Sequence, residues 1–369
     1  MIYFDNAATS FPKPGSVIRA TNDCIKRYCG NPGRSSHALS NKSAEMIYSA
    51  REAVADLLGG VEPEGVVFTY NATYALNLAI KSFVDSDCHI ITSDFEHNSV
   101  IRPIEALKKR YKIDLSFFAD EREIESLIRN ETTGIICTLG SNVTGDSFDL
   151  KRLSDIAKKN NLFLIVDASQ TIGHRNIDLI NAPCDVLCAP GHKALFGIQG
   201  SGFAVFKNLD RKIGLVEGGS GSDSERKDMP PLLPEGYEAG TLATPVIVSL
   251  QSGIKYIKDI GLDNIQNKLD CLIDAMYERL TSLSSAKVYK RGNGIISFNL
   301  GDLPSSAVAY ELDRLGICTR AGLHCAPSVH RRLGTLKQGT VRISFSYFNS
   351  LRQIDSFYKA IRSIEKMLL

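Results

Sequence analysis

Short apolar runs alternate with longer amphipathic stretches over roughly the first half of the chain. The runs are rich in β-branched residues and lack strict apolar–polar alternation, which is typical of strands buried on both faces. Between most of them, as over 43–58 and 150–160, apolar residues recur at helical spacing. This pattern predicts an α/β fold with a mainly parallel sheet. The seven predicted strands cover 65–69, 89–93, 115–118, 134–138, 162–167, 186–189 and 202–206.

After these strands the pattern changes. Residues 217–225 and 230–234 are rich in Gly, Ser and Pro and predict a flexible loop. A second, smaller α+β unit then follows. Its predicted helices cover 246–260, 262–282, 305–315 and 350–369, and its predicted strands cover 295–299 and 341–344. We therefore expect a large domain over 15–245 and a small domain made of 1–14 and 246–369.

Composition narrows the class of protein. A chain of 369 residues is long enough for two domains. Hydrophobic residues make up 43% and charged residues 23%, which excludes a wholly disordered chain, collagen or a simple coiled coil. The 43 basic and 41 acidic residues give a net charge of +2, so we expect neither nucleic acid nor a membrane as partner.

Cysteine usage favours a reducing compartment. The nine cysteines are odd in number and contain no C-x-x-C pair, so we expect free thiols and a cytoplasmic location. The opening MIYFDNAATS lacks a basic stretch followed by an apolar core, so we expect no signal peptide. No apolar run reaches about 18 residues, so we expect no transmembrane helix.

Common ligand-binding motifs are missing from the sequence. There is no phosphate-binding P-loop, no H-E-x-x-H and no EF-hand loop. The glycine-rich run 197–202 leads into a strand and has the wrong spacing for a dinucleotide site. Cys184 and Cys188 have no His pair nearby, which favours buried thiols over a metal site. We expect no metal.

One acid and one lysine follow neighbouring predicted strands. Asp167 ends the run 162–167, and Lys193 comes shortly after the run 186–189. Open α/β sheets bind ligands at the carboxyl ends of their strands. An Asp facing a pyridinium nitrogen, with a lysine able to form an imine, is the recurring apparatus of pyridoxal phosphate enzymes. Taken alone, the pair equally fits a loop-capping Asp and a surface Lys.

The chain resembles class-V aminotransferase-fold enzymes from end to end, and among them cysteine desulfurases and selenocysteine lyases. The resemblance implies the fold-type I transferase architecture, bound pyridoxal 5'-phosphate and a homodimer. The reaction it implies converts L-cysteine to L-alanine and leaves the sulfur on an active-site cysteine. The segments that carry the resemblance are 4–10 (FDNAATS), 167–170 (DASQ), 191–193 (GHK), 238–241 (EAGT) and 320–327 (RAGLHCAP).

The resemblance assigns roles around the cofactor ring. Lys193 would hold the cofactor covalently and, once released, move the Cα proton. Asp167 would keep the ring nitrogen protonated. His97 would stack on the ring and relay protons. Gln170 and Asn142 would lie near the phenolic oxygen and the substrate.

It also assigns a phosphate site. Ala72 and Thr73 lie where a predicted helix begins, and backbone N–H groups there suit an anion. His192 matches a second phosphate ligand, and Thr241 matches a residue that reaches the phosphate of the neighbouring subunit. Pro190 stands where the family often has Ser or Thr, so one hydroxyl donor is lost.

The resemblance makes Cys325 the residue that accepts the substrate sulfur. Arg320 and His324 flank it, and we expect both to favour the nucleophilic thiolate. Arg320 would also border the substrate, and Arg342 would bind its carboxylate through two N–H groups. A further loop that borders the active site in this family matches Arg34 and His37.

Other functions stay open. Selenocysteine lyases share the site, and selenium leaves so easily that a thiol may be dispensable. Another class-V aminotransferase or a racemase would use the same lysine and acid. A non-catalytic scaffold on this fold is the alternative outside enzymology. A sulfur-acceptor protein is a further possible partner.

Overall fold

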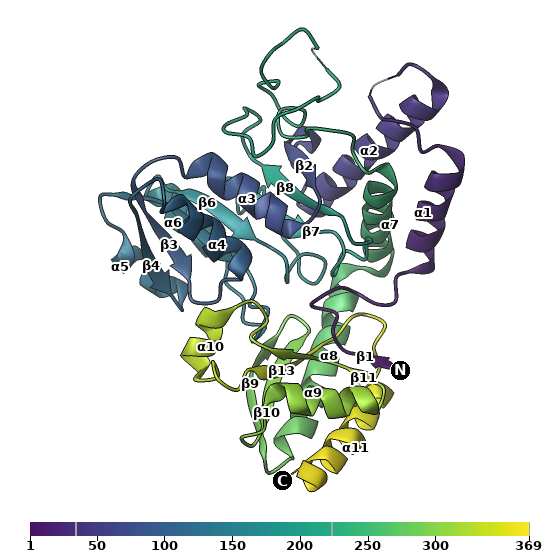
Figure 1. Cartoon of the computed structure of the whole chain (residues 1–369), viewed down its shortest axis with the longest axis vertical. Coiled ribbons are helices and arrows are strands. Elements are labelled where there is room, and N and C mark those ends of the chain that lie inside the picture. Colours follow the sequence, from purple (N-terminus) through teal and green to yellow (C-terminus); the bar gives the residue numbers. More distant parts are fainter. Residues whose placement is uncertain (34, 223, 369) are drawn as a thin grey trace.

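The computed structural model describes residues 1–33, 35–222 and 224–368. Figure 1 shows a large α/β part, drawn at the top, and a smaller α+β part below it. The chain passes between them from α7 (Thr244–Ile260) into α8 (Leu262–Thr281). The two helices meet at Gly261, whose φ of 88° is a left-handed conformation that glycine adopts without strain. The predicted domain limits stay a prediction.

The large part is built on a seven-stranded sheet in the order β2-β8-β7-β6-β5-β3-β4. Strand β8 runs antiparallel to β2 and β7, and the other pairs are parallel. All seven predicted strands are therefore present, in the predicted mainly parallel sheet. The strands are β2 (Val66–Thr69), β3 (Cys88–Ser93), β4 (Ile113–Phe118), β5 (Thr132–Thr138), β6 (Phe163–Asp167), β7 (Val186–Pro190) and β8 (Gly202–Phe206).

Both faces of this sheet are buried, which explains the near-continuous apolar runs. Ile135 packs into one hydrophobic core and Ile136 into the other, as successive strand residues must. Helices cover both faces, with α3 and α4 together on one of them. The large part contains helices α1 (Gly15–Arg27), α2 (Ala38–Leu57), α3 (Ala72–Phe83), α4 (Asn98–Leu107), α5 (Ile124–Leu127) and α6 (Leu150–Lys159), with 3-10 turns at Pro63–Gly65 and Glu121–Glu123.

The small part contains a four-stranded antiparallel sheet in the order β12-β13-β10-β9. Strand β1 (Ile2–Tyr3) pairs in parallel with β11 (Ile317–Cys318). No helix within the described ranges has the length and apolar character needed to cross a membrane. The other elements are β9 (Ala286–Gly292), β10 (Ile295–Leu300), β12 (Arg320–Gly322), β13 (Thr340–Ser344), α9 (Ser305–Arg314), α10 (Pro327–Leu333) and α11 (Leu351–Leu368).

The N-terminal segment joins the two parts. After β1 it hydrogen-bonds to the small part, where Asn6 Nδ2 donates to Ser344 O at 2.9 Å. It then reaches the large part, where Lys13 Nζ donates to the carbonyl of His192 at 2.8 Å. The backbone N–H of Ser10 donates to the same carbonyl at 3.2 Å. The segment therefore contacts the turn that carries Lys193.

A buried ion pair covers the free edge of the sheet at β2. Arg51 on α2 and Glu238 are both buried and pair through both guanidinium N–H groups. Arg51 Nη1 also donates to Val66 O, and Glu238 Oε1 accepts from Phe68 N at 2.6 Å. The pair thus supplies the donor and the acceptor that a neighbouring strand would supply.

Candidate active site

The carboxyl ends of β5, β6 and β7 open into a cavity of about 210 Å³. Residues from both parts of the chain line it, so the site lies where the two parts meet. Of the predicted catalytic, cofactor-binding and substrate-binding residues, Cys325 and Thr241 lie outside its lining. The predicted residues that line it are Ala72, Thr73, His97, Asn142, Asp167, Gln170, His192, Lys193, Arg320 and Arg342.

Asp167 and Lys193 face this one cavity from neighbouring strand ends. Asp167 is the last residue of β6 and is buried, and its Oδ1 accepts a hydrogen bond from Ser169 N at 2.9 Å. Lys193 follows β7. Burial lowers the pKa of the Lys193 amine to about 8, with Arg342 and Arg320 lowering it further and Asp167 opposing them. About a tenth of this amine is therefore neutral and nucleophilic at pH 7, far more than for an ordinary lysine.

His97 is held as a neutral imidazole. It caps the N-terminus of α4, and its Nδ1 accepts from Ser99 N at 3.1 Å. Nδ1 is therefore the acceptor, which places the ring proton on Nε2. Burial lowers the pKa of His97 to about 4, against the opposing effect of Asp167. The ring can donate a hydrogen bond from Nε2 but carries no charge at neutral pH.

Ser99 links two predicted site residues and was not itself predicted. Its hydroxyl hydrogen-bonds to Thr73 Oγ1 at 2.9 Å and to His97 Nδ1 at 2.8 Å. A serine two residues after a histidine carries no pattern that would mark it. The Thr73 hydroxyl is thus oriented by a partner on α4.

One end of the cavity suits an anion. Helix α3 begins at Ala72, and Asn71 caps it by accepting from Tyr74 N at 3.1 Å. The N–H groups of the first helical turn have no partner inside the helix and point to its N-terminus. His192 adds a ring whose Nδ1 lies 3.1 Å from Thr9 Oγ1, and burial lowers its pKa to about 4. This end offers neutral donors that suit a phosphate.

Another part of the cavity wall is cationic. Arg342 is 1% exposed, and it donates to Asp5 Oδ1 at 2.9 Å and to Asn142 O at 3.0 Å. Its Nε is buried and has no partner among the described residues. Arg320 lies opposite Arg342 on the neighbouring strand. These two side chains can bind a carboxylate, and Asp5, which the sequence analysis missed, fixes one of them.

Gln170 and Asn142 contribute amides to the cavity wall. Gln170 Nε2 donates to Ala7 O at 3.2 Å, which ties it to the N-terminal segment. Asn142 Nδ2 donates to His324 O at 2.7 Å, and its Oδ1 is buried without a partner in the described chain. Asn142 therefore fixes the turn that carries Cys325, and its Oδ1 can still accept a hydrogen bond from a ligand.

Cys325 lies on a strained turn beside the cavity. His324 and Cys325 have φ values of 50° and 59°, a left-handed conformation that costs free energy in residues other than glycine. Asn98 N donates to Cys325 O at 2.7 Å and so holds the turn against α4. The thiol itself is exposed. The turn thus presents a fixed thiol at the outer edge of the site.

The expected influence of His324 on this thiol is wrong. His324 is buried, and its Nε2 lies 3.1 Å from both Thr340 O and Thr340 Oγ1. Burial, with Arg342 adding to it, lowers the pKa of His324 far below its usual value. A neutral imidazole supplies no positive charge to Cys325, so Arg320 is the flanking cation that remains.

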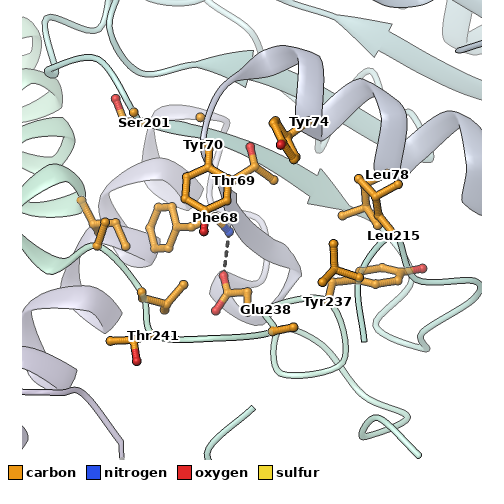
Figure 2. A pocket seen from close by; sticks show the side chains of 17 residues that line it. Phe68, Thr69, Tyr70, Tyr74, Leu78, Ser201, Leu215, Tyr237, Glu238 and Thr241 are labelled. Atoms are coloured by element: carbon orange, nitrogen blue, oxygen red, sulfur yellow. Dashed lines mark hydrogen bonds between the residues drawn. The ribbon is translucent and has the colours of Figure 1, made fainter. Parts of the chain in front are cut away.

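Thr241 lies in a second, apolar cavity of about 150 Å³ (Figure 2). Figure 2 shows Tyr70, Tyr74 and Tyr237 around this cavity, with Glu238 hydrogen-bonded to β2 behind them. The predicted border residue His37 lines neither cavity and instead caps α2 by accepting from Ser40 N. The other predicted border residue, Arg34, lies outside the described residues.

The first cavity fits pyridoxal phosphate. Its lining combines an amine, a buried carboxylate and a neutral imidazole with donors for a phosphate and cations for a carboxylate. Two buried polar atoms without partners, on Asn142 and Arg342, still need a ligand in the described structure. No group of His, Cys, Asp and Glu in those same residues is arranged to hold a metal ion.

The chain is similar to known proteins over its whole length. The model of the class-V aminotransferase family matches residues 2–357. A probable cysteine desulfurase of Pyrococcus abyssi is 32% identical over 100% of this chain and 95% of its own length. A second, of Borreliella burgdorferi, is 31% identical over 100% and 92%. The apo structure of a cysteine desulfurase from Thermococcus onnurineus superposes with a TM-score of 0.89 at 28% identity, covering 100% of this chain and 95% of that one.

Proposed function

We propose, from the premise that this chain belongs to the class-V aminotransferase family, that it is a pyridoxal-phosphate-dependent cysteine desulfurase. The observation that carries the proposal is the meeting of Lys193 and Asp167 in one cavity, with Arg342 at one end and Cys325 beside it. An aminotransferase needs the first three residues but has no use for a thiol there.

When bound, the cofactor supplies an electron sink for the negative charge that develops at the substrate Cα. Asp167 stabilises a proton on the ring nitrogen through its buried carboxylate. Arg342 and Arg320 bind the substrate carboxylate and orient the Cα–H bond. Lys193 Nζ, whose lowered pKa leaves part of it neutral, removes the Cα proton, and His97 Nε2–H is a hydrogen-bond donor in the same cavity.

Cys325 then accepts the sulfur. Its thiolate attacks the substrate sulfur, an S–S bond forms and the Cβ–S bond breaks. The electron pair of the broken bond ends in a C–H bond once a proton is added, so the products are L-alanine and a Cys325 persulfide. No external oxidant is needed. The exposure of Cys325 would let a sulfur-acceptor protein approach this persulfide.

Replacing Cys325 with alanine should abolish persulfide formation and lower alanine release from L-cysteine by about a hundredfold or more. The yellow colour of the bound cofactor should persist, because Cys325 does not line the cavity. Alanine can be measured by amino-acid analysis and the persulfide by mass spectrometry. Cys271→Ala, at another exposed cysteine, is the matched control and should behave as wild type.

The substrate used in this assay decides between the related reactions. Full activity of Cys325→Ala on L-selenocysteine, with none on L-cysteine, would assign selenocysteine lyase activity to the same site. Transfer of the amino group to a keto acid, without sulfide or persulfide, would instead identify an aminotransferase and contradict the proposal.

We also propose that the enzyme works as a homodimer joined across the apolar cavity of Figure 2. Tyr70 and Tyr74 are 62% and 46% exposed and pack edge to face, and exposed apolar groups of this kind mark interfaces. Thr241, on the same rim, would reach the phosphate in the partner's cavity. The nine free cysteines favour a reducing, cytoplasmic setting.

Sedimentation of the wild type should give twice the 40.4 kDa of one chain. Tyr74→Glu should shift the protein towards the mass of one chain, because it places a charge in the apolar interface. Thr241→Ala should stay dimeric and bind pyridoxal phosphate about tenfold more weakly, as expected for one lost hydrogen bond. A fully active wild-type monomer would rule the dimer out.

A further inference from the structure

Glu96 is a completely buried carboxyl directly before His97 in the chain. Its Oε1 accepts two hydrogen bonds, from the hydroxyl of Ser93 and from the backbone N–H of Thr138 at 2.9 Å. Ser93 ends β3 and Thr138 ends β5, the next strand in the sheet. This one carboxyl therefore joins two strand ends at the edge where the first cavity opens.

The groups around Glu96 do not favour a negative charge. No Lys, Arg or His of the described chain pairs with it, and its Oε2 is buried without a partner. The titratable groups that act on it from the packed strands are Asp167 on β6 and Cys137 on β5. Burial raises the pKa of Glu96 to about 8, and the charge of Asp167 adds to this. Most molecules thus hold an uncharged acid here at neutral pH.

The residues that Glu96 ties together form part of the cavity wall. His97 and Thr138 both line it. The hydroxyl of Thr138 also lies 3.3 Å from Asp167 O, and Thr138 is paired with Asp167 across β5 and β6. A shift at Glu96 would therefore move His97 relative to Asp167.

We propose that Glu96 is a positioning residue that, as an uncharged acid, locks the end of β3 to the end of β5 and so holds His97 in the cavity that Asp167 lines. An ionised Glu96 would place a second, uncompensated negative charge beside Asp167. The effect of Glu96 on catalysis depends on the proposed desulfurase function. The protonation state of Glu96 does not depend on it.

The charge can be tested by the pH dependence of stability. The folded-state pKa of Glu96, about 8, lies above its unfolded value. The folded protein therefore binds more protons between the two values, and the wild type loses stability as pH rises through this window. Glu96→Gln keeps the acceptor oxygen and cannot ionise, so it should lack this loss.

Thermal unfolding of the full chain, with and without pyridoxal phosphate, should be compared between pH 5 and pH 9. The melting temperature of Glu96→Gln minus that of wild type should increase by several degrees up to about pH 8 and then level off. Glu52→Gln, at an exposed carboxylate on α2, should show a constant difference. Parallel curves for wild type and Glu96→Gln would mean that Glu96 is ionised and would overturn the proposal.

The positioning role is tested through His97. Glu96→Ala should lower kcat for L-cysteine at least tenfold with little change in KM, and should change the visible circular dichroism of the bound cofactor. Glu96→Gln should stay within about twofold of wild type at pH 7. Because Glu96 acts through His97, the double variant Glu96→Ala/His97→Ala should be no slower than His97→Ala. If Glu96→Ala fails to fold, Ser93→Ala removes one of the same hydrogen bonds and should show a smaller loss in the same direction.

Two results would contradict the positioning role. One is Glu96→Gln being as slow as Glu96→Ala. The other is a double variant whose loss equals the product of the two single losses, as independent structural damage would give. If the wild type has no desulfurase activity at all, the proposed function fails, but the stability curves still decide the charge of Glu96.

Discussion

Replacing Lys193 with alanine should abolish covalent attachment of pyridoxal phosphate and lower alanine production from L-cysteine by about a thousandfold or more. Lys193 is the amine that lines the cavity beside Asp167, and its lowered pKa keeps part of it neutral near pH 7. No other lysine lines the described part of that cavity, so the lining holds no second amine to replace Lys193.

Attachment can be followed by borohydride reduction and mass spectrometry of the peptide that contains residue 193. Lys109→Ala, at an exposed lysine, should keep the label and the activity of wild type. A Lys193→Ala protein that still carries the reduced cofactor on another lysine would show that the assignment is wrong.

Breaking the buried pair of Arg51 and Glu238 should lower the free energy of unfolding by about 3–5 kcal/mol. Glu238→Ala leaves a guanidinium buried without its counter-charge, and it also removes the acceptor for Phe68 N on the free edge of β2. Arg51→Ala leaves the carboxylate unpaired and removes the donor to Val66 O. Chemical denaturation of each variant measures the loss.

An exposed pair offers the comparison. Glu45→Ala breaks the surface pair with Lys42 and should cost less than about 1 kcal/mol. Arg51→Met/Glu238→Leu removes both buried charges and should be more stable than either single variant. Losses below about 1 kcal/mol in both single variants would mean that water reaches the pair in solution.

Strands could be predicted from the sequence where most of their side chains are buried, because burial leaves a continuous apolar run. Six of the seven strands of the large sheet are mostly buried, so each reads as an apolar run, whereas the edge strand β4 is buried only at its two ends. Strand β9 has a single buried residue, and β12 has only three residues, so neither leaves such a run. Helix α4 contains Pro103, which argues against a helix in any pattern analysis.

Site residues that belong to a sequence motif were predicted. Site residues that join the others only through tertiary contacts were missed. Asp5 pairs with Arg342 across 337 positions of sequence, and nothing near residue 5 indicates that partner. Ser99 is set between Thr73 and His97 only once α3 and α4 pack together. The predicted effect of His324 on Cys325 was wrong because it rested on their adjacency in sequence. The sequence does not reveal that the His324 ring contacts Thr340.

The segment that joins the two parts has a consequence for how the protein is made. Asp5, Asn6 and Ala7 are translated more than three hundred residues before their partners Arg342 and Ser344. Until those partners are made, these three residues lack their contacts with the small part. We therefore expect the large sheet to form during translation, and the cleft for substrate to close only as the last strand docks.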